Sequence, residues 1–222
     1  RRIFDFARSL VGHVCGGLAH VNVVASIIFA GMSGTAQADA AGLGIIEIEE
    51  MRRDGFDPAF AAAVTAASAI IGPIVPPSVI LVIFAVMTEV SVAGLFLGGF
   101  IPGVIMGLLL MGMIYWLAAT KRVHAPSLPQ QPFRVVWRSF LGAFPALVAP
   151  VFLVGGMLLG VATPTELGAI VVVYGIVLGL IYRELTLREL LEIFAESAIM
   201  YGILVFFISV AFPFGWLVAI NQ

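Results

Sequence analysis

Two short stretches combine small, hydroxyl-bearing and proline residues in a way that suits a cation and a small polar solute. The first is Gly31–Gly44, GMSGTAQADAAGLG, and the second is Gly72–Pro77, GPIVPP. Each interrupts a long apolar segment. Non-helical backbone is tolerated at bilayer depth only where it is buried in protein or lines a polar cavity. We therefore interpret the two interruptions as a binding site and the remaining chain as its frame.

The first stretch carries oxygen atoms that suit a hard cation. Ser33 and Thr35 offer hydroxyls, and Gly34 between them lets the backbone approach a ligand closely. Asp39 follows shortly after, and an ionisable group at bilayer depth is costly unless it is paired or hydrated. Two compatible interpretations of Asp39 stay open: it tunes the charge of a cation site, or it hydrogen-bonds loop backbone.

The second stretch breaks a helix, because its three prolines lack backbone donors and disfavour helical geometry in the residues before them. Carbonyls at the end of the first half-helix suit Na⁺, and the N-terminus of the next suits an anionic group. The alternative is that both stretches serve helix packing alone. The predicted cation and substrate site comprises Ser33, Gly34, Thr35, Asp39, Thr65, Ser68, Gly72, Pro73, Pro76, Pro77 and Ser78, with Na⁺ near Ser33, Thr35, Ser68 and Gly72.

Other residues with catalytic or metal-binding potential form no such pattern. His13 and His20 have no carboxylate one helical turn away, and the single Cys15 excludes an internal disulfide and a multi-cysteine metal site. No HExxH or GxSxG sequence occurs. We expect neither an enzyme nor a cofactor other than Na⁺ as a coupling ion, and we interpret these side chains as packing or interfacial residues.

Composition places the frame in a membrane. The chain of 222 residues is 61% hydrophobic and 11% charged, against roughly 25% charged residues in an ordinary soluble domain. Its mean hydropathy is +1.13. A net charge of −2 gives no basic surface for nucleic acid. The sequence predicts an all-α integral membrane protein.

The site-bearing half of the chain predicts a re-entrant helical hairpin followed by a discontinuous helix. Residues 1–17 form an amphipathic interfacial helix or the polar end of a preceding span. Residues 18–56 form the hairpin with its tip at 33–35, because fifteen apolar residues, Leu18–Met32, reach only ~22 Å against ~30 Å of hydrocarbon. Residues 57–90 form a helix that begins at the Asp57-Pro58 cap and is broken at 72–77.

Residues 91–222 predict scaffold helices. A loop at 121–138 separates the first two spans, and an arm helix at 186–197 leads into the last. Capping boxes at Thr163–Glu166 and Thr186–Glu189 mark two of the helix starts. The expected spans are Val92–Thr120, Ser139–Val161, Leu167–Tyr182 and Ala198–Ile220.

The basic residues support the hairpin. If residues 18–56 enter and leave on one side, alternation places all 11 Lys and Arg residues on the cytoplasmic side, as the positive-inside rule predicts. If these residues crossed the membrane once, Arg52 and Arg53 would lie outside. The charge pattern and the length of the arms therefore favour the same topology.

Three motifs also resemble a known family. The runs GGLAHVNVVASIIFAGMSGTAQADAAGLG, DGFDPAFAAAVTAASAIIGPIVPPS and ATPTELGAIVVVYG are similar to the large membrane subunit, DctM-type, of tripartite ATP-independent periplasmic (TRAP) transporters. The resemblance covers essentially all 222 residues. It implies a secondary transporter of the bacterial or archaeal cytoplasmic membrane, with inverted repeats and an elevator movement.

The resemblance further implies Na⁺-driven symport of a small organic acid, such as a C4-dicarboxylate or a sialic acid. The implied partners are a small membrane subunit and a periplasmic substrate-binding protein. Ser33-Gly34-Thr35 would form the first hairpin tip, Gly72–Pro77 the unwound helix, and Na⁺ would bind between them. The helix after Thr186 would brace the moving part.

One departure from the family pattern concerns length. Members carry a second hairpin and a second broken helix, whereas nothing after Pro77 repeats the first pair. We therefore expect the chain to be one half of an inverted-repeat transporter. The rival hypotheses are a non-transporting membrane scaffold or assembly subunit and a channel, although no ring of like charges or filter-like carbonyl run indicates a channel.

Overall fold

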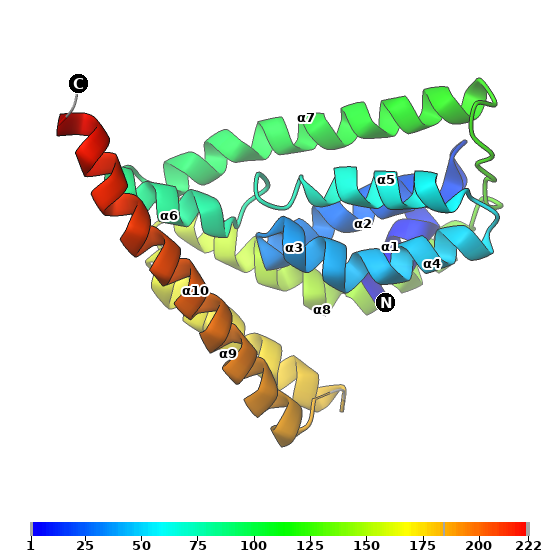
Figure 1. Ribbon diagram of the computed structural model, residues 1–222. Helices are drawn as coiled ribbons and strands as arrows, with labels where there is room; N and C mark the ends of the chain where they lie inside the picture. The colour runs from blue at the N-terminus through cyan, green and yellow to red at the C-terminus, as the bar shows by residue number, and fades with distance from the viewer. Residues whose placement is uncertain (1, 184, 221–222) are drawn as a thin grey trace. The chain divides into compact units, whose positions relative to one another are not determined.

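The computed structural model describes residues 2–183 and 185–220, and in this part of the chain it consists of helices and turns without strands. Arg1, the first residue of the expected interfacial helix, lies outside the described residues. The elements, drawn in Figure 1, are α1 (Arg2–Val11), α2 (Gly17–Ser33), α3 (Ala36–Ala38), the π-helical turn η1 (Asp39–Leu43), α4 (Gly44–Arg53), α5 (Pro58–Ala69), α6 (Val79–Thr88), α7 (Val92–Ala119), α8 (Phe133–Leu158), α9 (Pro164–Ile181) and α10 (Leu187–Ile220).

Four helices among the described residues are long and apolar enough to cross a membrane. They are Val92–Ala119, Phe133–Leu158, Pro164–Ile181 and the Leu187–Val210 part of α10. Their surfaces expose many large apolar side chains, including Leu109 and Val173, as expected where lipid is the solvent. The prediction of an all-helical multi-pass membrane protein is confirmed.

Three shorter apolar helices precede these spans. α2 has 17 residues, α5 has 12 and α6 has 10. At ~1.5 Å per residue the longest of them reaches only about 25 Å, less than the ~30 Å hydrocarbon core. This length agrees with a re-entrant arrangement, whose placement in a bilayer stays a prediction.

Local capping chemistry explains how the chain reverses after α2. Gly34 adopts a left-handed conformation (φ 62°), and its N–H donates to the Ala30 carbonyl, which ends α2. Thr35 is extended and its hydroxyl accepts a hydrogen bond from the Ala38 N–H at 3.3 Å, which begins α3. We call Ser33–Thr35 the tip, and the continuous helical segment α3–η1–α4 the arm. The arm contacts both α2 and α5.

A second reversal leads from the arm into α5. The Asp57 carboxylate accepts hydrogen bonds from the N–H groups of Ala59 and Phe60 at 2.9 and 3.0 Å, and Pro58 occupies the first helical turn. The predicted helix start at Asp57-Pro58 is confirmed. The capping boxes at Thr163–Glu166 and Thr186–Glu189 also form as predicted, with reciprocal hydrogen bonds between each pair.

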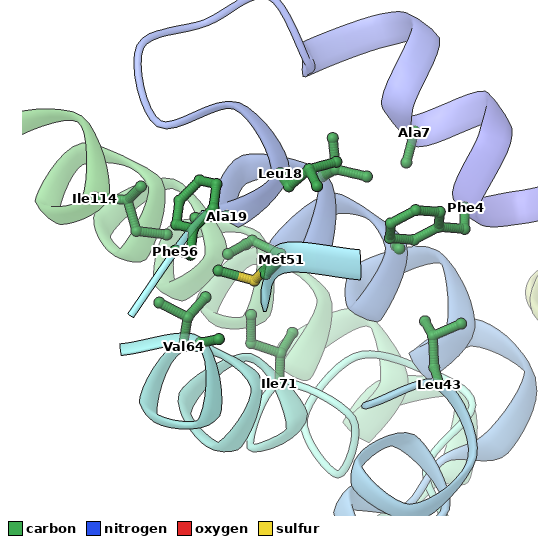
Figure 2. Packing of buried hydrophobic residues seen from close by; sticks show 14 of the residues in the cluster. Phe4, Ala7, Leu18, Ala19, Leu43, Met51, Phe56, Val64, Ile71 and Ile114 are labelled. Atoms are coloured by element: carbon green, nitrogen blue, oxygen red, sulfur yellow. The ribbon is translucent and has the colours of Figure 1, made fainter. Parts of the chain in front are cut away.

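One hydrophobic core holds α2, the arm, α5 and α7 together. Leu18 and Ala19 of α2 meet Met51 of α4, Val64 of α5 and Ile114 of α7. Figure 2 shows these side chains converging between the helices. Each is at most 3% exposed. This packing fixes the positions of the polar residues described below.

The scaffold helices differ from the predicted boundaries at several ends: α9 begins at Pro164 rather than at Leu167, and α8 ends at Leu158 rather than at Val161. The largest difference is at the start of α8. α8 begins at Phe133 rather than at Ser139, so the connection expected at 121–138 is shorter at its C-terminal end. Pro132 precedes the helix with extended geometry, and the residues from Phe133 to Arg138 offer no helix-breaking residue. α7 and α8 remain continuous through Pro102, Pro145 and Pro150.

The chain divides into two compact units, one ending at Val171 and the other beginning at Val172. The first contains α1 to α8 and the start of α9, where Leu167 packs with Phe96 and Met157. The second contains the rest of α9 and α10. The expected arm helix at 186–197 is the first part of α10, which continues without interruption into the expected span.

Candidate functional site

The tip and the break lie against each other, although they are about forty residues apart in the sequence. We keep the name break for Gly72–Pro77. The Val79 N–H donates to the Gly34 carbonyl at 3.4 Å. A Cβ atom added to Gly34 would lie 2.5 Å from the Pro77 carbonyl oxygen, and one added to Gly72 would lie 3.1 Å from the Thr35 carbonyl oxygen. Only glycine permits such close backbone approaches.

The break is a series of tight turns. After α5 ends, the N–H groups of Ile71, Gly72 and Ile74 donate to carbonyls three residues back. Ser78 then connects the two half-helices: its hydroxyl donates to the Pro73 carbonyl at 2.5 Å and accepts from the Leu81 N–H at 3.3 Å. The hydroxyl therefore caps α6, and it helps to close the turn through the prolines.

Several oxygen atoms at this contact could serve a small hard cation. The Ser33 hydroxyl is buried without a hydrogen-bond partner, and the Thr35 and Pro77 carbonyls face the glycines of the opposite segment. Within the described residues no group of three His, Cys, Asp or Glu side chains forms a metal cluster. The arrangement suits an alkali cation, which binds hydroxyl and carbonyl oxygens, and so the donor set fits Na⁺.

Thr65 and Ser68 belong to a second polar group rather than to the tip. The Ser68 hydroxyl donates to Asn22 Oδ1 at 2.7 Å and accepts from Ser26 at 3.1 Å. Asn22 Nδ2 donates to the Thr65 hydroxyl at 2.7 Å. All four residues are at most 4% exposed. These hydrogen bonds join α2 to α5, and they place Ser68 in a network distinct from Ser33 and Thr35.

Asp39 begins the π-helical turn and is 1% exposed. Neither carboxylate oxygen has a hydrogen-bond partner, although the Ser26 hydroxyl lies close enough to act on the carboxylate. The cap of α3 is the Thr35 hydroxyl. The interpretation that Asp39 hydrogen-bonds loop backbone is therefore not supported, and its position inside the bundle leaves the electrostatic interpretation open.

Sequence reasoning missed three buried polar residues of this region: Asn22, Ser26 and Glu47. Each is at most 1% exposed. Asn22 and Ser26 are one helical turn apart on α2, and Thr65 and Ser68 are one turn apart on α5. Two polar pairs at helical spacing on short apolar helices are the signal that could have predicted their pairing.

A family model described as "Tripartite ATP-independent periplasmic transporter, DctM component" matches residues 1–222. The chain belongs to this family. Among similar proteins, the sialic acid TRAP transporter large permease protein SiaM of Vibrio cholerae is 44% identical over the whole chain. The sialic acid TRAP transporter permease protein SiaT of Haemophilus influenzae is 42% identical, and the C4-dicarboxylate large permease protein DctM of Pseudomonas aeruginosa is 37% identical, both over the whole chain.

The DctM-family chain is shorter than these relatives. It covers 52% of the Vibrio and Pseudomonas proteins and 36% of the Haemophilus protein. The family membership predicted from the three sequence motifs is confirmed. The relatives are named as transporter permeases, and none of the three names describes an enzyme.

Proposed function

We propose that this DctM-family chain is part of a permease subunit that couples Na⁺ entry to the uptake of a small organic anion. The observation that carries the proposal is the close approach of the tip to the break, where the buried Ser33 hydroxyl lacks a partner. A carboxylate substrate is favoured because the named relatives handle a sialic acid and C4-dicarboxylates. The protein would work in a bacterial or archaeal cytoplasmic membrane with a small membrane subunit and a periplasmic binding protein.

In this mechanism Na⁺ stabilises the packed state of the site. Ser33, Thr35 and Gly72 would supply hydroxyl and carbonyl oxygens, with Ser68 and Asp39 acting through the polar network and the local charge. The N-terminus of α6, capped by Ser78, would face the substrate carboxylate, since helix N-termini attract anions. An elevator movement would then carry the site across the membrane relative to scaffold helices.

The test is uptake into proteoliposomes by the full-length permease with its partner subunit and binding protein. Radiolabelled sialic acid and a C4-dicarboxylate serve as probes while the Na⁺ gradient is varied. We expect uptake to require Na⁺, and Ser33→Ala and Pro73→Ala to weaken its Na⁺ dependence. Ser127→Ala, an exposed serine in the connection between α7 and α8, is the control. Uptake that does not depend on Na⁺, or that neither site variant changes, would refute the coupling of uptake to Na⁺ and favour a structural role for the tip.

A further inference from the structure

Glu47 is a buried carboxylate in the arm to which neither the predicted site nor the family description gives a role. Its side chain is 1% exposed, and both of its oxygens are buried without a hydrogen-bond partner. An ionised carboxylate in that state carries a large desolvation penalty. The protein must therefore supply Glu47 with a counter-charge, with hydrogen-bond donors, or with a proton.

Among the described residues, no ion pair reaches Glu47. The basic side chains at the end of α4, Arg52 and Arg53, pair instead with Glu49 and Glu50. These pairs lie on the outer face, with side chains 35% to 70% exposed. The titratable groups of α4, and of the elements that contact it, are His20 on α2, Asp39 on η1, and Glu47, Glu49, Glu50, Arg52 and Arg53 on α4. α1 adds Arg2, Asp5 and Arg8, of which Arg8 reaches Glu50.

His20 does not pair with Glu47, because its Nε2 is hydrogen-bonded to the Cys15 carbonyl at 2.9 Å and its Nδ1 is buried without a hydrogen-bond partner. The charged group that acts on Glu47 electrostatically is Asp39, and an ionised Asp39 would be negative, as an ionised Glu47 would be. α5 carries no ionisable side chain between Pro58 and Ala69. Two like charges buried near each other disfavour ionisation of both.

The neutral hydrogen-bond donors around the arm already donate to acceptors other than Glu47. Asn22 donates from Nδ2 to the Thr65 hydroxyl and to Met51 Sδ at 3.9 Å, and Thr65 donates to the Ala61 carbonyl. Ser68 donates to Asn22, and Ser26 donates its single O–H to Ser68. If Ser26 rotated, it could serve one carboxylate oxygen of its neighbour Asp39, and Glu47 would still lack a donor.

Of the three ways to stabilise a buried carboxylate, these contacts leave protonation for Glu47. We propose that Glu47 is a proton-binding residue that carries a proton while the arm is packed against α2 and α5. The neutral acid needs no counter-charge, and it supplies its own O–H donor. A Na⁺ ion would need several oxygens around it, whereas the residues one turn to either side of Glu47 are Leu43 and Met51.

The proton comes from water and returns to it. When the arm separates from α2 and α5, water reaches the carboxyl group, the O–H bond breaks, and the proton leaves as hydronium. Repacking reverses this step. Because the proton is bound only in the packed state, packing of the arm becomes less favourable as the pH rises. The inference does not rest on the proposed transport function.

Infrared difference spectroscopy of the full-length protein in lipid tests this directly, without substrate or an ion gradient. At neutral pH we expect the carbonyl stretch of a protonated carboxylic acid, which disappears on alkaline titration. Glu47→Gln should remove this band while the protein stays folded, because the amide is neutral and similar in shape. Glu49→Gln should retain it, because the Glu49 side chain is 40% exposed on the same helix and pairs with Arg52 and Arg53.

Thermal melting supplies the second readout. The melting temperature of the native protein should fall relative to that of Glu47→Gln as the pH rises, and Glu47→Met should behave as Glu47→Gln does. Three results would overturn the proposal: identical carboxylic acid bands in the native protein and Glu47→Gln, loss of the band on adding Na⁺ at constant pH, or failure of both neutral variants to fold.

Discussion

Replacement of the tip glycine by alanine, Gly34→Ala, should separate the tip from the break. Gly34 has φ 62°, a conformation that costs a non-glycine residue roughly 1–2 kcal/mol. The new Cβ would also lie 2.5 Å from the Pro77 carbonyl oxygen, which is backbone and cannot rotate away. Overpacking of this kind typically costs about 1–3 kcal/mol. Together, the two effects should destabilise the contact between the tip and the break by at least ~2 kcal/mol.

Hydrogen exchange at Val79 measures this loss, because its N–H donates to the Gly34 carbonyl across the contact. A loss of ~2 kcal/mol corresponds to roughly a 30-fold rise in the exchange rate of the amide. Gly42→Ala, in the arm that follows the tip, is the matched control, since its added Cβ would meet only Phe29 at 3.9 Å. Equal exchange rates of the Val79 amide in the two variants would show that the tip is not in close contact with the break.

Two further substitutions test the packing around the site. Asn22→Ala removes the side-chain acceptor of the Ser68 hydroxyl, which keeps the Thr65 carbonyl, and also removes the donor to the Thr65 hydroxyl. It should cost about 1–3 kcal/mol of stability, measured by thermal melting, whereas a loss near zero would mean that the network is dispensable. Gly103→Val places its Cβ 2.5 Å from a valine methyl of the break and should lower the melting temperature, while Gly112→Val, with nothing within 4 Å, should not; equal effects would contradict the α7 packing.

The parts of the fold that depend on neighbouring residues were predictable. Asp57 caps α5 because its carboxylate reaches N–H groups only two and three residues ahead. The two capping boxes form for the same reason. The three closely spaced prolines of the break interrupt the helix, whereas α7 and α8 continue through their more widely spaced prolines. Such interactions require no knowledge of distant segments, so the sequence pattern contains all that determines them.

The parts that depend on distant contacts were not predictable. The hydrogen bonds of Asn22 with Thr65 and Ser68 join residues more than forty positions apart, and the burial of Glu47 follows from packing of the arm on α2 and α5. In the sequence, Glu47 stands beside Glu49 and Glu50, and nothing in that local pattern distinguishes the buried carboxylate from its neighbours. The π-helical turn at Asp39–Leu43 gave no compositional sign, because it consists of ordinary helix-compatible residues.

The π-helical turn η1 affects how the arm packs against α2 and α5 at the same time. A regular α-helix rotates about 100° per residue, so positions four apart drift steadily around its axis. Four of the five buried residues of the arm nevertheless recur at every fourth position, at Asp39, Leu43, Glu47 and Met51, and the fifth is Gly44. The π-helical turn keeps the buried positions on either side of it on one face of the arm. Deleting one residue from this turn would rotate Asp39 and the tip away from the break, while α4 would keep its packing against α2 and α5.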